Sequence, residues 1–209
     1  MGISAGRFGA SARRASGVVL ALCCAWGCAA PAGPALPASE QGRGDLIKAA
    51  QQVLVDRCLQ TRGAVGPPPR HEALFGAGPA ELSLTLATGY TVRAHTDGCL
   101  AEAHRFLYGD QARWFRAEVT VNNLRPEAQA RLGEDADYRA ALARRAACGD
   151  NDTPCIRGSG LEQLRNRLEP VRLAQVRAAH RADIETYDRL RDRAVHRAAA
   201  LLADRPPPT

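Results

Sequence analysis

Four cysteines beyond the N-terminal region constrain this 209-residue chain more than any other feature. They are Cys58, Cys99, Cys148 and Cys155, and an even number of cysteines in an exported protein predicts two disulfide bonds with three possible pairings. Zinc ligation is the rival interpretation, but no two of these cysteines have the Cys-x₂₋₄-Cys spacing that is typical of zinc sites. We therefore expect two covalent links, and no bound metal or cofactor.

The N-terminus has the organisation of an export signal, which we assign to residues 1–27. A basic stretch ends at "ARRASG", and the apolar run "GVVLALCCAWG" follows. Eleven helical residues span about 16 Å, whereas the hydrocarbon core of a bilayer is about 30 Å thick. The run is therefore too short to act as a stable transmembrane anchor.

The sequence "AWGC" at residues 25–28 resembles a bacterial lipobox, which predicts lipidation of Cys28. The alternative is ordinary cleavage after "APA" at residues 30–32, which would release a secreted protein. Residues 28–44 are rich in Pro, Ala and Gly and suit a tether. We favour a cell-membrane lipoprotein, because acyl chains would supply the membrane attachment that the short apolar run lacks. Both alternatives place the mature chain outside the cytoplasm.

The composition favours helices and argues against nucleic acid as a partner. Hydrophobic residues make up 45% of the chain but aromatic residues only 5%, with alanine supplying much of the difference. Half of the net charge of +6 comes from Arg7, Arg13 and Arg14 in the predicted signal, and the other arginines are interleaved with acidic residues. A nucleic-acid interface would instead need clustered, unopposed basic residues. Residues 45–204 are long enough for a single helical domain, followed by a tail at 205–209.

Apolar periodicity predicts a mainly α, disulfide-stapled helical bundle with one small β-hairpin and a long C-terminal helix. The leucines of "ELSLTLATGYTVRAHT" alternate with polar residues, which indicates a hairpin over residues 81–96. The three prolines after Gly66 predict an extended loop. The expected helices cover residues 45–62 with Asp45 as N-cap, 97–108 with Asp97 or Thr96 as N-cap, 111–124 with Asp110 as N-cap, 126–132, 137–148 and 170–203.

The apolar positions of residues 170–203 recur every eleven residues, as in Leu173, Ile184 and Val195. This period of about 3.67 residues per turn keeps an apolar stripe aligned along a straight helix. Such a stripe either packs along the bundle or pairs with a second copy, so a homo-oligomer through residues 170–203 is possible.

Residues 95–115 carry the densest set of polar side chains, but no catalytic pattern emerges. Cys99 and His104 are five residues apart on a helix and point about 140° away from each other, which argues against a nucleophile–base pair. His95 and His104 have no metal-binding motif. We therefore predict no catalytic, cofactor-binding or metal-ligating residues.

Two segments resemble a known family: "GYTVRAHTDGCLAEAHRFLYGDQARWFRAEVTVNNL" and "DADYRAALARRAAC". They are similar to a family of uncharacterised exported proteins and lipoproteins of actinobacteria, whose members share DGCxxEAxRxLYG and WFRA patterns. The resemblance covers about residues 46–200 and implies export, helices and cysteines, but no activity or substrate. This chain departs from the family in the shortened segment "GPPPRHEALFG" and in the short connection between Cys148 and Cys155.

The family normally separates its last two cysteines widely. The resemblance therefore implies the pairing Cys58–Cys148 and Cys99–Cys155, with each bond contributing up to about 4 kcal/mol.

These observations predict a non-enzymatic module of the cell envelope that is attached to the membrane through Cys28 and contacts an envelope protein or polymer. One alternative is a secreted hydrolase-type enzyme with a site assembled around His95, Glu102 and His104. A homo-oligomeric structural protein is the other alternative.

Overall fold

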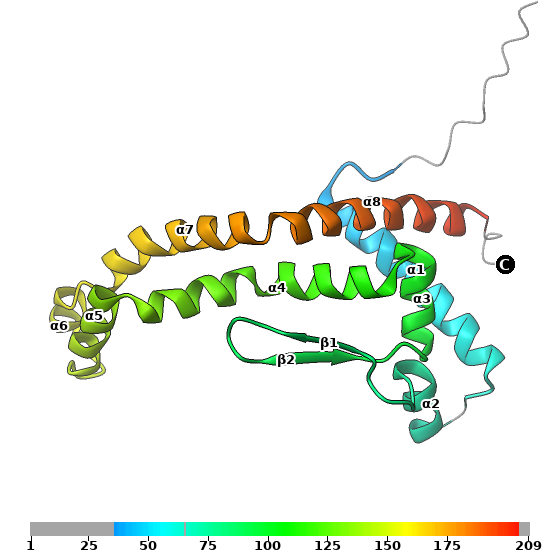
Figure 1. Cartoon of the computed structure of the whole chain (residues 1–209), viewed down its shortest axis with the longest axis horizontal. Coiled ribbons are helices and arrows are strands. Elements are labelled where there is room, and N and C mark those ends of the chain that lie inside the picture. The colour runs from blue at the N-terminus through cyan, green and yellow to red at the C-terminus, as the bar shows by residue number, and fades with distance from the viewer. Residues whose placement is uncertain (1–35, 65, 205–209) are drawn as a thin grey trace, which may run out of the picture. The chain divides into compact units, whose positions relative to one another are not determined.

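The computed structural model describes residues 36–64 and 66–204, and it confirms a mainly α fold with one antiparallel hairpin (Figure 1). The predicted signal at 1–27, the lipidation site Cys28 and the tail at 205–209 lie outside the described residues. No helix in the described part is both long and apolar enough to cross a membrane. The elements are α1 (Glu40–Thr61), α2 (Pro67–Phe75), β1 (Leu82–Thr85), β2 (Thr91–Ala94), α3 (Cys99–Tyr108), α4 (Gln111–Glu134), α5 (Ala136–Ala146), α6 (Thr153–Gly158), α7 (Leu161–Ala179) and α8 (Arg181–Ala203).

Helix α1 begins at Glu40, before the expected start at Asp45. The hydroxyl of Ser39 accepts a hydrogen bond from the backbone N–H of Gly42 at 3.1 Å, so Ser39 is the N-cap. The last residues of the predicted tether are consequently helical.

The start of α3 also differs from the expectation. Its N-cap is Gly98, whereas Asp97 accepts hydrogen bonds from the backbone N–H groups of Ala77 and Gly78 at 3.1 and 3.0 Å. These bonds lower the pKa of Asp97, because they favour its charged form. A Cβ at position 98 would lie 2.5 Å from the carbonyl oxygen of Leu74, so the close approach of α2 requires glycine there. Asp110, by contrast, caps α4 as predicted, accepting from the N–H of Arg113.

Two long helical segments differ from the prediction in their breaks. Helix α4 continues through Pro126 to Glu134, where two helices were expected. The predicted helix over 170–203 is divided at His180 into α7 and α8, and α7 already begins at Leu161.

The core is formed where α4 packs against α7 and α8, and where α1 packs against α3 and α8 (Figure 1). Fully buried alanines such as Ala50, Ala194 and Ala198 allow these helices to approach closely. The indole of Trp114 stacks between two tyrosine rings, 3.5 Å from Tyr108 and 5.2 Å from Tyr187 between ring centroids. This aromatic stack joins α3, α4 and α8.

The cysteines form two disulfides, but the pairing implied by the family resemblance is wrong. Cys58 bonds to Cys99, and Cys148 bonds to Cys155. The first bond joins α1 to the start of α3, within a cluster that includes the buried Val55 and Leu59. The second bond is local, because the short turn after α5 returns the chain by the first turn of α6.

Candidate binding cavity

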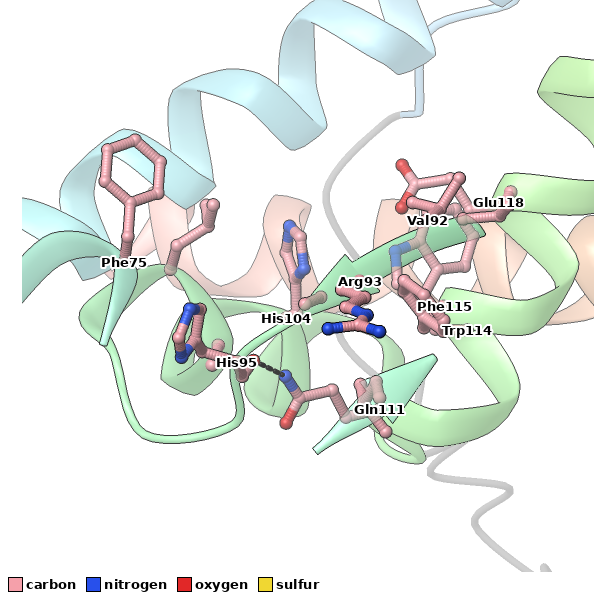
Figure 2. A pocket seen from close by; sticks show the side chains of 14 residues that line it. Phe75, Val92, Arg93, His95, His104, Gln111, Trp114, Phe115 and Glu118 are labelled. Carbon is pink, nitrogen blue, oxygen red and sulfur yellow. Dashed lines mark hydrogen bonds between the residues drawn. The ribbon is translucent and has the colours of Figure 1, made fainter. Parts of the chain in front are cut away.

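A cavity of about 310 Å³ lies between the hairpin, α3, α4 and the end of α2 (Figure 2). This volume is at the lower end of the range found for small-molecule sites. Its apolar lining consists of Phe75, Leu82, Val92, Ala94, Leu100, Ala101, Trp114, Phe115 and Val119.

The hairpin supplies one wall because its side chains alternate between two faces. Leu82 pairs with Ala94 and Leu84 pairs with Val92, so these four residues share one face of the hairpin. All four are less exposed than Ser83 and Arg93, which lie between them on the opposite face. A two-stranded hairpin is marginal alone, and contacts between β1 and α4 support this one. The same contacts fix the cavity wall.

Aromatic rings dominate the opposite wall and the mouth. Trp114, which is only 3% exposed, and Phe115 come from consecutive positions of α4. Phe75, the last residue of α2, also lines the cavity but is 44% exposed. Phe75 therefore stands at the boundary between the cavity and solvent.

Two ionisable side chains in the lining are held in an environment that disfavours charge. Burial lowers the pKa of His104, so its imidazole is neutral at pH 7. Burial raises the pKa of Glu118; the nearby indole N–H of Trp114 partly counteracts this effect, although no hydrogen bond of normal geometry joins the two. The ring of His104 also meets Tyr108 edge-on, at 5.6 Å between centroids. The cavity thus combines a mainly apolar lining with a neutral imidazole, a carboxyl group whose pKa is raised, and the exposed arginine Arg93.

Two buried nitrogen atoms of the lining have no hydrogen-bond partner among the described residues: Nδ1 of His95 and Nε1 of Trp114. The carboxylate of Asp97 lies 4.0 Å from Nδ1, too far for a hydrogen bond. Gln111 instead donates to the backbone carbonyl of His95 at 3.2 Å, as Figure 2 shows. An unpaired buried polar atom costs about 1–3 kcal/mol, so a ligand that satisfied either atom would recover part of that cost.

The structure brings together only part of the site considered for a hydrolase. His95 and His104 line the same cavity, but Glu102 forms an ion pair with Arg62 and is not part of the lining. Cys99 is in a disulfide and has no thiol to act as a nucleophile. No group of three His, Cys, Asp or Glu side chains that could hold a metal ion occurs within residues 36–64 and 66–204.

Comparisons with family models, curated proteins and solved structures find no match to this chain. The site is therefore interpreted from its own geometry.

Sequence reasoning missed Glu118 and Gln111. Glu118 follows Trp114 by four residues and so occupies the same side of α4. An acid on a stripe that also carries Trp114 and Val121 is a usable signal for a buried carboxyl group. Gln111 gave no comparable signal, because its role depends on the hairpin returning to the start of α4.

Proposed function

We propose that this protein is a non-enzymatic binding module whose cavity accepts a compact, mainly apolar and uncharged ligand. The observation that carries the proposal is an aromatic-lined cavity with two buried, unpartnered nitrogen atoms in its wall. Apolar contact would supply most of the affinity, and a hydroxyl or carbonyl group on the ligand would accept a hydrogen bond from Trp114.

The electrostatics of the lining support an uncharged ligand. Both His104 and Glu118 have pKa values displaced toward their neutral forms by burial. A charged ligand would lose its hydration on entry, and Arg93, the arginine of the lining, is exposed to water, which weakens its attraction for an anion.

A comparison of two naphthalene derivatives tests the ligand class. In isothermal titration calorimetry, 2-naphthol is expected to bind and the anion 2-naphthoate to bind at least about tenfold more weakly, a difference of about 1.4 kcal/mol. Ala94→Leu is expected to remove binding by filling the cavity. Ser83→Leu, on the opposite face of the same hairpin, is the matched control and should leave binding unchanged. Equal binding of both compounds, or unaltered binding to Ala94→Leu, would refute the proposal.

The location of the protein is a separate part of the proposal. Two disulfides are typical of proteins that fold outside the reducing cytoplasm. The export signal, the lipobox-like "AWGC" and the resemblance to exported actinobacterial proteins support attachment to the cell membrane through Cys28, facing an envelope protein or polymer. Intact-mass analysis of the membrane fraction tests this: a diacylated Cys28 is expected, and an N-terminus at Gly33 would show a secreted protein instead.

The hydrolase alternative lacks support from the cavity. Its acid, Glu102, is engaged with Arg62, and its two histidines share a cavity that holds no nucleophilic serine, threonine or cysteine in its lining. We therefore do not propose a catalytic role for His95 or His104.

A further inference from the structure

Helices α5 and α6 and the start of α7 come together in the fold (Figure 1). A second cleft, of about 470 Å³, is lined by residues of these three helices and of the segment between α6 and α7. It shares no lining residue with the cavity beside the hairpin. Its walls carry three arginines, Arg145, Arg157 and Arg165, and one acid, Glu162. The side chains that line it therefore carry a net charge of +2.

Within the described residues, the three cleft arginines belong to those that form no ion pair with a carboxylate, whereas eight other arginines do form one. Arg116, Arg125 and Arg172, for example, each form an ion pair with a carboxylate. Across residues 36–64 and 66–204, no carboxylate oxygen lies within 4.0 Å of the guanidinium groups of the cleft arginines. Three unpaired guanidinium groups around one cleft produce a strong local positive potential.

The start of α7 adds to this potential. Gly160, in the left-handed conformation with φ of 72°, is the N-cap and has no side chain to cap the helix; the hydroxyl of Ser159 accepts a long hydrogen bond, 3.4 Å, from the N–H of Leu161. Glu162 and Gln163, whose backbone N–H groups belong to the first turn, both line the cleft. The positive end of a 19-residue helix therefore faces the same space as the arginines.

Covalent and hydrogen-bonded links hold the cleft in shape. The Cys148–Cys155 disulfide joins α5, just after Arg145, to α6, just before Arg157. Arg144 donates to the backbone carbonyl of Ser159 at 3.1 Å, which ties α5 to the segment between α6 and α7. The cleft arginines thus start from a backbone that is already fixed, which lowers the entropic cost of binding.

We propose that this cleft binds a phosphate group carried by a larger molecule. Guanidinium groups donate paired hydrogen bonds that match phosphate oxygens, and a doubly charged phosphate matches the net charge of the lining better than a single carboxylate does. The cleft is larger than a bare phosphate ion requires, and Ile156 and Leu161 offer apolar contact to the rest of the ligand. The carrier is either a soluble phosphate ester or the headgroup of a phospholipid.

Titration of the protein with glycerol 3-phosphate, followed by calorimetry, tests the shared chemistry. The variant Arg145→Gln/Arg157→Gln/Arg165→Gln is expected to bind at least about tenfold more weakly than the wild type. The matched control Arg139→Gln/Arg177→Gln/Arg181→Gln removes the same charge from exposed positions outside the cleft, and its affinity should change by less than about twofold. Equal losses in both triple variants would show a general charge effect and would overturn the proposal.

Vesicle sedimentation distinguishes the two carriers. Vesicles of phosphatidylglycerol in phosphatidylcholine are compared for the cleft variant and the control variant, so that any membrane anchor contributes equally to both. If the cleft variant sediments with the vesicles more weakly than the control variant, the phosphate belongs to a lipid headgroup. If both variants sediment equally but the wild type binds glycerol 3-phosphate, the phosphate belongs to a soluble ester. Absence of both effects in proteins with the circular dichroism and thermal unfolding of the wild type would overturn the proposal.

Discussion

Trp114 connects the core to the cavity, since its ring stacks between Tyr108 and Tyr187 while its Nε1 remains unpartnered. Trp114→Ala is expected to lower the free energy of unfolding by about 3–5 kcal/mol, because it removes a buried ring and leaves a space between two tyrosines. Trp114→Phe keeps an aromatic ring and should lose less than half as much. Urea denaturation measures both variants, and a loss below about 1 kcal/mol for Trp114→Ala would contradict the central role of the stack.

His104 makes stability depend on pH in a defined direction. Burial lowers its pKa in the folded state, so between about pH 6.5 and that lower value the unfolded chain binds the proton more readily. The stability that the neutral imidazole provides is therefore complete above about pH 6.5 and is lost as the pH falls through this interval. Glu118 acts in the opposite direction, since its raised pKa makes the folded state bind the proton more readily above about pH 4.5.

Comparison of two histidine variants isolates the effect of His104. His104→Gln is expected to flatten the fall in unfolding free energy as the pH drops below about 6.5, because the titrating group is absent. His196→Gln, at a side chain that is 63% exposed, is the control and should follow the wild-type profile. Urea titrations at several pH values supply the curves, and parallel profiles for wild type and His104→Gln would exclude the proposed burial effect.

At the scale of elements, the sequence predicted which segments are helices better than where the helices begin and end. The three prolines were expected to form a loop, yet Pro67 begins α2, because the first turn of a helix leaves its N–H groups unpaired in any case. Pro126 and Pro170 were each expected to start a helix, yet both lie inside one. Both prolines are exposed, so water can reach the carbonyl groups that lose a donor. The helix continues through each proline because the residues before and after it pack against other helices. Such long-range packing is not visible in a local sequence pattern.

The break between α7 and α8 at His180 is a second feature that the local sequence pattern did not predict. The eleven-residue recurrence was correct for the apolar stripe but gave no sign of a change of direction. In the structure Glu127 of α4 is only 8% exposed, and its two carboxylate oxygens contact His180 at 2.8 Å and Arg131 at 2.6 Å. A partly buried polar cluster that joins α4 to His180 therefore accompanies the junction of α7 and α8.

His180→Ala is expected to lower the free energy of unfolding by about 1–3 kcal/mol, because it leaves one oxygen of a buried carboxylate without its partner. His196→Ala is the matched control on α8; its histidine is exposed and lies 3.8 Å from Asp192, so its loss should be within about 0.5 kcal/mol. Equilibrium urea denaturation compares the two variants. Equal losses would show that the Glu127–His180 contact contributes nothing specific.

The two disulfides should contribute unequally because they close loops of different length. The cysteines are 41 residues apart in Cys58–Cys99 and seven apart in Cys148–Cys155, which gives about 4 and about 2.5 kcal/mol in the chain-entropy model. Double serine variants at each pair, compared by thermal unfolding, are expected to follow this order. The pairing itself is checked by peptide mapping without reduction, in which a peptide that joins Cys58 to Cys148 would contradict the structure.

At the scale of the whole molecule, the cavity was the part least accessible to sequence reasoning. His95 and His104 were identified as candidates for a hydrolase-type site, together with Glu102, which is not part of the cavity lining. Only the packing of α4 against the hairpin brings Glu118, Phe115 and Trp114 to the same space. The fold class could be predicted because helix period and strand alternation are local, whereas a cavity formed by four separate elements is not.

The same packing bears on whether the chain associates with a second copy through residues 170–203. Val176, Leu190 and Val195 of the apolar stripe are already buried within the chain, as α7 and α8 cover α4 and α8 covers α1. Val171, which is 52% exposed, is a large hydrophobic residue left at the surface of α7, and a single apolar side chain is far too small for a stable interface. We therefore expect size-exclusion chromatography with light scattering to give the mass of a single chain, and Val171→Asp to leave that mass unchanged. A dimer that dissociates on Val171→Asp substitution would contradict this expectation. It would show that α7 pairs with a second copy even though most of the apolar stripe is buried within one chain.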